Sequence, residues 1–260
     1  MLSHSQNSIP KWCNATLIAR ELVAADIVLL RFEIVGASYV RHIPGQYYDL
    51  RIVLPGGVVS ERSYSIANVP NEKGIIEFGI QLIEDGEVSP FLWNLTVGDV
   101  IDMRGPSGNF VWNPLEPKFA CKHLILIGGG SGMVPLMSML RQYVEMKKIE
   151  PQTPGLCQRV YVVVSAKSIA TIPYHEELER IASKFPEVNL TITVTGDVLE
   201  EWKRYTKRID EEVLREVLGD TSPANARIYI CGRNRFIDTI TSSLVSVGYS
   251  LGDIRTERFG

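Results

Sequence analysis

The stretch HLILIGGGSGMVP, residues 123–135, joins an unbroken apolar run to a cluster of glycines and then to a helical pattern. An apolar run without alternation is typical of a strand that is buried on both faces of a parallel sheet. After the glycines, apolar residues recur at helical spacing and predict one buried helix face, formed by Met133, Leu136, Met137, Leu140, Tyr143 and Val144. Pro135 falls in the first turn of this helix, which favours a defined helix start.

The glycine cluster at residues 128–132 is a candidate anion site. Glycines let the backbone approach a ligand, and the helix N-terminus offers unpaired amides and the positive end of the helix dipole. In a sheet of this kind a pyrophosphate is the usual ligand. A structural tight turn is the alternative, because Met133 stands where the common dinucleotide fingerprint has its third glycine.

Strands and helices alternate from this point to the end of the sequence. Further strands are expected at 159–165, 188–195, 227–231 and 253–259, with helices between them at 172–185, 209–218 and 234–247. Strict alternation with apolar strands predicts a doubly wound parallel sheet that is covered by helices on both faces.

The first half of the chain has a period of two instead. In DIVLLRFEI, residues 26–34, one face carries Val28, Leu30, Phe32 and Ile34. Five or six such strands without a long helix between them predict a small closed or half-closed antiparallel β-barrel. We therefore expect a flexible tail over residues 1–10, a barrel domain over 11–115 and an α/β domain over 116–260.

Composition and charge exclude several classes of function. A net charge of −3 gives no general attraction to nucleic acid or to an anionic membrane. The four cysteines include no pair close in sequence, which argues against a disulfide framework, a zinc site or an iron–sulfur cluster. No apolar run approaches the ~20 residues that span a bilayer. The tail lacks the pattern of a signal peptide. We expect a cytoplasmic protein with no metal site and neither nucleic acid nor membrane as a partner.

Two segments of the first half suggest a ligand site. In ERSYSIAN, residues 61–68, the side chains of Arg62 and Tyr64 share one face of an extended strand and could hold an anionic, planar molecule. In DGEVSPFLWNL, residues 85–95, Ser89 is expected to cap a short helix that has Pro90 at its first position. That helix either plugs the barrel or binds a diphosphate together with Arg62.

Seven short motifs occur in an order that resembles the ferredoxin–NAD(P) reductase family of flavoproteins, particularly the bacterial reductases that supply electrons to oxygenases. The motifs are PGQY (44–47), RSYS (62–65), GEVS (86–89), GPSGNF (105–110), GGGSGMVP (128–135), YICG (229–232) and TERFG (256–260). The resemblance implies an FAD-binding barrel followed by an NAD(P)-binding α/β domain. It also implies hydride transfer from a nicotinamide to the flavin at the cleft between the two.

The resemblance assigns roles to residues of the flavin site. Arg62 would pair with the flavin phosphates, Tyr64 would stack on the isoalloxazine ring, and Ser65 would lie by the reactive N5, on the strand that also carries Ser63. The diphosphate site would be completed by Gly86, Val88 and Ser89. A site for two phosphates implies FAD rather than FMN.

The same resemblance assigns the nucleotide side. The dinucleotide would bind at Gly129, Gly130, Ser131 and Gly132, and the nicotinamide would lie beside Cys231 and Gly232. Arg233 replaces the proline that usually follows in the family. Glu257 would lie near the hydride path, and Phe259 would cover the flavin face opposite Tyr64.

The electron acceptor is expected to be a separate protein, because the sequence carries no iron–sulfur motif. A ferredoxin or the iron–sulfur protein of an oxygenase is favoured, with Arg41, Arg51 and Lys73 as candidates for a basic docking patch. Two alternatives remain open. One is a diaphorase or flavin-reductase enzyme with small-molecule acceptors, and the other is a flavin- or nucleotide-binding subunit without turnover.

The choice of NADH or NADPH depends on the segment TITVTGDVLEEWKRYTKR, residues 191–208. Five basic residues could pair with a 2′-phosphate: Lys167, Lys203, Arg204, Lys207 and Arg208. Asp197 would repel a phosphate at that place, and the basic run is also what an ordinary solvated helix face shows. NADH is favoured over NADPH.

Overall fold

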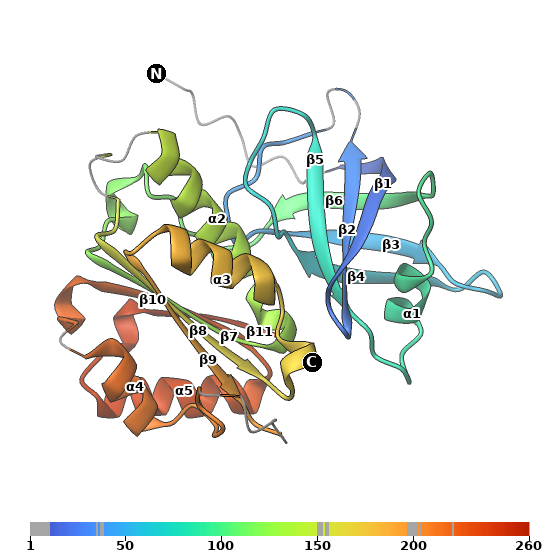
Figure 1. The fold of residues 1–260 in the computed structure, drawn as a ribbon. Helices are drawn as coiled ribbons and strands as arrows, with labels where there is room; N and C mark the ends of the chain where they lie inside the picture. Colours follow the sequence, from blue (N-terminus) through green and yellow to red (C-terminus); the bar gives the residue numbers. More distant parts are fainter. Residues whose placement is uncertain are drawn as a thin grey trace.

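Two β-sheets, one in each half of the chain, organise the protein (Figure 1). The computed structural model describes residues 11–34, 36, 39–149, 153, 156–196, 202, 204–219 and 221–259. The expected tail, residues 1–10, lies outside the described residues. Within the described part of the chain, no helix has the length and apolar character that crossing a bilayer requires.

The first sheet is antiparallel and has the order β4-β3-β6-β1-β2-β5. Its strands are β1 (Trp12–Ala24), β2 (Ile27–Ile34), β3 (Tyr47–Val53), β4 (Val59–Ser65), β5 (Ile75–Gln81) and β6 (Val100–Ser107). The two end strands approach each other where Ile66, just after β4, forms a bridge with Phe78 of β5. The sheet therefore curls into the expected barrel, and the four residues on the predicted inner face of β2 are all buried.

The helix α1 (Val88–Trp93) connects β5 to β6 and corrects one expectation. Its N-cap residue is Glu87, and Ser89 is the second residue of the helix, so the prediction that Ser89 caps it is wrong. The Ser89 hydroxyl instead accepts a hydrogen bond from the backbone N–H of Ile83 at 3.0 Å. This hydrogen bond ties the Ser89 side chain to the turn that precedes the helix. Because the helix begins at Val88, Pro90 is its third residue and not its first.

The second sheet is parallel and has the order β11-β10-β7-β8-β9, which confirms the doubly wound prediction. Its strands are β7 (His123–Gly129), β8 (Arg159–Ala166), β9 (Val188–Val194), β10 (Ala226–Gly232) and β11 (Ile254–Arg258). The strand order reverses between β7 and β10, and ligands of such sheets bind at this point beyond the carboxyl ends of the strands.

Helices cover both faces of the parallel sheet (Figure 1). The α-helices are α2 (Met133–Ile149), α3 (His175–Lys184), α4 (Glu211–Leu218) and α5 (Asn234–Ser246). Short 3₁₀ turns are η2 (Pro117–Phe119), η3 (Gly130–Gly132), η4 (Ile169–Thr171), η5 (Pro223–Asn225) and η6 (Leu251–Asp253). Successive side chains of β7 pack into different cores: Leu124 and Leu126 on the side of α2 and α3, Ile125 and Ile127 on the side of α4 and α5.

One hydrophobic core joins the two halves. The core around α2 also contains Leu29 of β2, together with Phe110 from the segment that follows β6. Phe110 meets Tyr229 of β10 edge to face at 5.4 Å, and the Tyr229 hydroxyl donates a hydrogen bond to the carbonyl oxygen of Val111 at 2.8 Å. The outward side chain of Leu29 is thus buried by the other half, which makes β2 apolar on both faces.

A half-buried arginine of α2 adds polar contacts to the same joint. Arg141 donates to the carbonyl oxygen of Ala67 at 2.9 Å and to the carboxylate of Glu77, on β5, at 3.2 Å. Its other end donates to Glu177 of α3 at 2.6 Å. Arg141 therefore ties the barrel to two helices of the second half.

We predict that Arg141→Ala lowers the free energy of unfolding by about 2 kcal/mol, because Glu177 and the carbonyl of Ala67 lose a donor while Glu77 keeps Arg31 as a partner at 2.6 Å. Denaturant titration measures the change. Arg215→Ala is the matched control, since Arg215 forms an exposed pair with Glu211 and should cost under about 0.5 kcal/mol. Equal losses in the two variants would show that Arg141 is no more important than a surface residue.

Candidate active site

A cavity of about 710 Å³ lies between the two halves of the protein. The barrel contributes residues of β4, β5 and α1, and the α/β half contributes the glycine loop, the start of α5 and the end of the chain. The cavity's lining residues include Arg62, Ser63, Tyr64, Ser65, Gln81, Ser89, Ser131, Val134, Arg233, Arg235 and Phe259. A volume of this size suits a cofactor-sized ligand.

Strand β4 presents four consecutive residues, 62–65, to this cavity. Alternate residues of a strand point to opposite faces, so a cavity that touches all four must run along the strand's edge. β4 is an end strand of its sheet, which leaves that edge open. Tyr64 packs against the barrel core, and burial raises its pKa to about 12. Ser63 donates a hydrogen bond to Asp49 at 2.6 Å.

The cavity carries positive charge that carboxylates do not neutralise. Arg62, Arg233 and Arg235 all line it, and none of the three forms an ion pair within the described part of the chain. Among the described residues, the Arg62 side chain donates to the backbone carbonyl of Glu61, at 2.8 Å. Such a site favours an anionic ligand.

The sequence patterns did not predict that Arg233 and Arg235 line the cavity. The signal was available, because both follow RIYIC, a strand whose carboxyl end is predicted to open on the crevice. Arg233 was noted only as a departure from the family's usual proline.

A hydrogen-bonded group crosses the boundary between the halves at one side of the cavity. Ser65 of β4 donates to the Glu257 carboxylate of β11 at 2.9 Å, and the Cys231 thiol lies 3.9 Å from the same oxygen. Cys231 and Glu257 are register partners on β10 and β11. Burial raises the pKa of Glu257 and raises that of Cys231 well above its ordinary value. Cys231 is itself buried.

The glycine loop approaches the barrel as well as its own sheet. Gly130 has φ +54°, which favours glycine, and a Cβ on Gly132 would lie 2.1 Å from the carbonyl oxygen of Cys231. Gly132 therefore allows the loop to pack on β10. Ser131 donates to Gln81 of β5 at 2.9 Å, and Gln81 in turn donates to Asp26 at 2.7 Å.

Several predicted site residues lie behind the cavity wall. Gly86 donates its backbone N–H to Ile83 at 2.9 Å in the turn before α1, and Val88 is buried in the barrel core. Gly129 ends β7, and the carbonyl of Gly232 accepts a hydrogen bond from the backbone N–H of Phe259 at 3.3 Å. These residues shape the backbone that supports the lining side chains.

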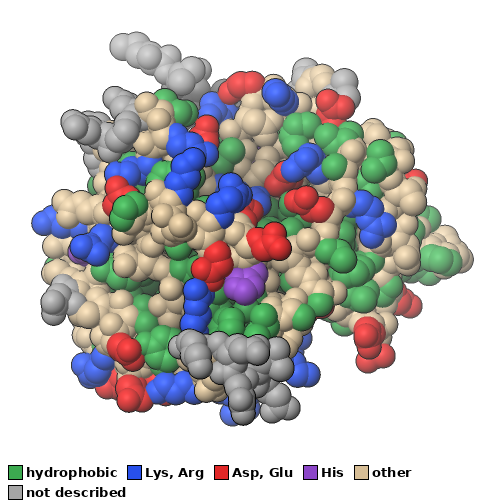
Figure 2. All heavy atoms as spheres, in the orientation of Figure 1, with side chains coloured by type: hydrophobic (Ala, Val, Ile, Leu, Met, Phe, Trp, Pro, Cys, Tyr) green, Lys and Arg blue, Asp and Glu red, His purple; other side chains and the backbone are tan. Residues whose placement is uncertain are grey.

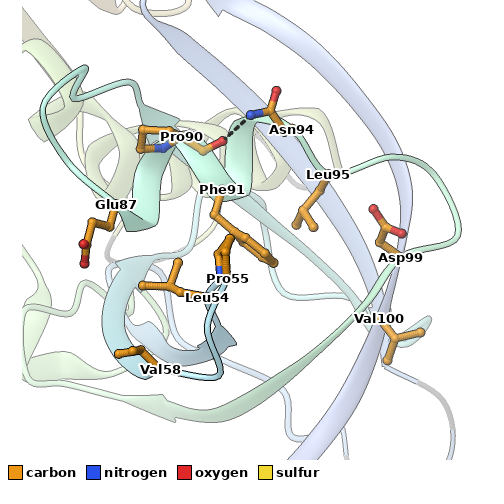
Figure 3. A pocket seen from close by; sticks show the side chains of 10 residues that line it. All are labelled: Leu54, Pro55, Val58, Glu87, Pro90, Phe91, Asn94, Leu95, Asp99 and Val100. Carbon is orange, nitrogen blue, oxygen red and sulfur yellow. Dashed lines mark hydrogen bonds between the residues drawn. The ribbon is translucent and has the colours of Figure 1, made fainter.

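A second cavity, of about 790 Å³, lies on the other side of α1 (Figure 3). Phe91 of α1 and Leu95, which follows the helix, face the β3–β4 hairpin, which contributes Leu54 and Val58. Its charged lining residues are carboxylates, Glu87 and Asp99. An apolar cavity with acidic groups does not suit an anionic cofactor, so the interdomain cavity is the candidate active site although it is smaller.

Comparison with known proteins matches the two halves of the chain to two different domain families. Residues 14–112 match the family described as "Oxidoreductase FAD-binding domain", and residues 126–242 match "Oxidoreductase NAD-binding domain". Ferredoxin--NADP reductase B of Sorangium cellulosum is 26% identical over 228 residues, which cover 87% of this chain and 88% of that protein. The chain belongs to the ferredoxin–NAD(P) reductase family. Its cofactors are accordingly FAD and a nicotinamide dinucleotide.

Two further known proteins are similar to this chain over part of their own length. One component of the Na(+)-translocating NADH-quinone reductase of Psychrobacter cryohalolentis is 27% identical over 211 residues, which are 76% of this chain and 48% of that protein. The chain thus spans about half the length of this relative. The flavohemoglobin of Malassezia yamatoensis has the same fold, with a TM-score of 0.80 and 24% identity over 98% of this chain and 61% of that one.

The residues of the interdomain cavity fit an FAD of this family. The cavity combines an aromatic ring, Tyr64, with the unpaired cation of Arg62 on an open strand edge. A planar ring system and an anionic diphosphate are what these two side chains can hold.

We predict that Tyr64→Ala weakens flavin binding by about 1 kcal/mol or more, because one aromatic contact is lost. Fluorescence titration of flavin-depleted protein measures the affinity. Tyr64→Phe keeps the ring and should bind flavin nearly as well as the wild type. If both variants bind with wild-type affinity, Tyr64 is not a wall of the flavin site.

A second prediction concerns Glu257, whose pKa burial raises above the 4.5 of an ordinary glutamate. A raised carboxyl pKa adds stability while the group is protonated, and that stability is lost as the pH rises through the raised value. The difference in Tm, wild type minus Glu257→Gln, should therefore fall as the pH rises from about 4 toward neutrality. A difference that stays constant over this range would mean that Glu257 titrates normally.

Proposed function

We propose that this protein moves a hydride from NADH to a bound FAD and passes the electrons to a separate iron–sulfur protein. The observation that carries the proposal is the cavity between the halves, where an aromatic ring and unpaired arginines meet residues from both domains. When bound, the flavin supplies the hydride-accepting chemistry. The protein's task is to bring two flat rings together and to exclude water.

The side chains divide this task between them. Arg62 binds the flavin diphosphate from the edge of β4, with Ser89 nearby, and Tyr64 packs on the ring. The Ser65–Glu257 hydrogen bond fixes a polar pair beside the reacting atoms and connects the domains at that place. Arg233 and Arg235, at the start of α5, bind the dinucleotide's phosphates.

The preference for NADH over NADPH as electron donor is supported by ion pairs near the expected adenosine site. Arg204 donates to both oxygens of Glu179, at 2.6 and 3.0 Å, and Lys207 pairs with Asp210 at 3.2 Å. A 2′-phosphate would have to compete with these carboxylates. Lys203 and Asp197 lie outside the described residues, and Lys167 and Arg208 are exposed.

The docking patch for the acceptor is better placed at the mouth of the cavity than where the sequence suggested. Arg41 pairs with Glu72 at 3.0 Å, and Arg51 pairs with Glu61 at 2.9 Å. Lys73 is exposed. Basic and acidic side chains are also interspersed over the face in Figure 2. Glu72 and Glu61 therefore neutralise Arg41 and Arg51, two of the three residues of the docking patch expected from the sequence.

Arg233 and Arg235 are exposed at the mouth of the cavity, and they become free for an acceptor once the oxidised dinucleotide has left, whereas Arg62 stays with the flavin diphosphate. An acidic partner is the acceptor that this charge would attract. The similarity to a ferredoxin--NADP reductase along nearly its full length supports a ferredoxin as that partner.

The test of the function begins with purified protein. It should be yellow, and NADH should bleach it in the absence of air, with kcat/KM for NADH above that for NADPH. A colourless protein that stays colourless with added FAD, or bleaching by neither donor, would leave only a non-catalytic subunit. A hundredfold preference for NADPH would overturn the choice of donor.

The acceptor is tested by adding a ferredoxin to the reduced enzyme. Oxidation by ferredoxin should be faster than by free flavin or dichloroindophenol at the same concentration. It should also slow as salt is added, because the attraction between opposite charges is screened. Faster reaction with the small molecules would favour the diaphorase alternative.

Phe259 gives a further prediction, because it lines the cavity at the end of β11. A phenyl ring over the flavin must move before a nicotinamide can take its place. Phe259→Ala should therefore lower the Kd for the nucleotide and change kcat, while FAD content stays the same. Phe259→Tyr keeps a ring and is the control. If Phe259→Ala leaves nucleotide affinity and turnover unchanged, Phe259 is only a packing residue. The last residue, Gly260, lies outside the described residues.

A further inference from the structure

Two cysteines that are far apart in the sequence meet at the amino ends of the parallel sheet. The Sγ atoms of Cys121 and Cys157 lie 3.1 Å apart, although the residues are 36 positions apart in the chain. Both are free thiols. Spacing along the sequence argued against a disulfide framework, and spacing could not show this contact.

The register of the sheet explains the contact. His123, the first residue of β7, pairs with Arg159, the first residue of β8. Cys121 and Cys157 each lie two residues before the start of their strand. Because the offset is the same, the two cysteines lie opposite each other. The backbone is already paired there, because the N–H of Gln158 donates to the carbonyl oxygen of Lys122 at 2.8 Å. Neighbouring strands are about 4.8 Å apart, which lies within the Cα separation that a disulfide spans.

The two thiols differ in access and can act in sequence. Cys121 is half-buried and reaches solvent, whereas Cys157 is buried in the core that joins the two halves. The hydrogen bond with Cys121 and burial raise the pKa of Cys157. Cys121 is thus the thiol that an oxidant meets first, and Cys157 is the neighbour that reacts with the product.

We propose that Cys121 and Cys157 form a reversible disulfide when the protein meets a peroxide. The Cys121 sulfur attacks the peroxide, the O–O bond breaks, one water leaves, and a sulfenic acid forms. The Cys157 sulfur then attacks the Cys121 sulfur, the S–O bond breaks, and a second water leaves. Two thiols lose two electrons and two protons, hydrogen peroxide is reduced to two waters, and a dithiol reductant reverses the change.

The cross-link acts on stability and leaves the cavity untouched. It closes the segment that contains the glycine loop and α2, which restricts the unfolded chain more than the folded one. The cavity lies at the opposite ends of the strands, about 20 Å away along seven residues of β7. The oxidised protein should therefore resist unfolding better, with turnover unchanged.

The test uses the full flavin-loaded protein with hydrogen peroxide. The count of titratable thiols in denaturant should fall from four to two. Peptide mass spectrometry should show the Cys121 and Cys157 peptides joined, lighter by two hydrogen atoms, and dithiothreitol should separate them. The Tm should rise by about 4 °C or more on oxidation and return on reduction.

Variants separate this disulfide from general thiol damage. Cys13→Ser is the matched control, because Cys13 lies on β1, where its thiol donates a hydrogen bond to the carbonyl of Met103. On oxidation this variant should still lose two thiols. Cys157→Ser should lose the cross-link and let Cys121 proceed to sulfinic acid. A cross-linked product that persists in Cys157→Ser, or wild-type Cys121 oxidised to sulfinic acid without a cross-link, would overturn the proposal.

Discussion

The fixed orientation of the two sheets is the constraint on which the rest of the structure depends. Neither half contains a complete site, because the cavity needs the edge of β4 on one side and the segments that follow β7 and β10 on the other. The helix α2 holds the halves together through a shared apolar core and through Arg141. The ring contact of Phe110 with Tyr229 secures the segment that links the sheets. A small rotation at this joint would separate the groups that must meet.

The two sheets supply different kinds of groups to the site. The barrel supplies a strand edge with an aromatic ring and a cation, while the parallel sheet supplies loop ends at its topological switch point. Ser65 and Glu257, one from each, form the hydrogen bond that bridges them. The cavity therefore depends on two different sheets and on the interface that brings them together.

Much of the architecture could be predicted from sequence because hydrophobic period depends only on local geometry. The period of two and the alternating apolar strands gave both sheets correctly. Contacts between distant residues were harder. Ser89 was expected to cap α1, but a competing backbone N–H of Ile83 takes its hydroxyl. Arg41 and Arg51 looked free until folding placed Glu72 and Glu61 beside them. The pairing of Cys121 with Cys157 needed the strand register, which no spacing rule contains.

The position of β4 at the end of its sheet has a consequence for handling the protein. An end strand offers unpaired N–H and C=O groups to any other chain that comes near, and such edges promote association. Here the cavity runs along that edge, so a bound ligand covers it in place of a neighbouring strand. The cofactor would then protect the solubility of the folded protein in addition to its chemistry, and protein stripped of its ligand would be the form most inclined to aggregate.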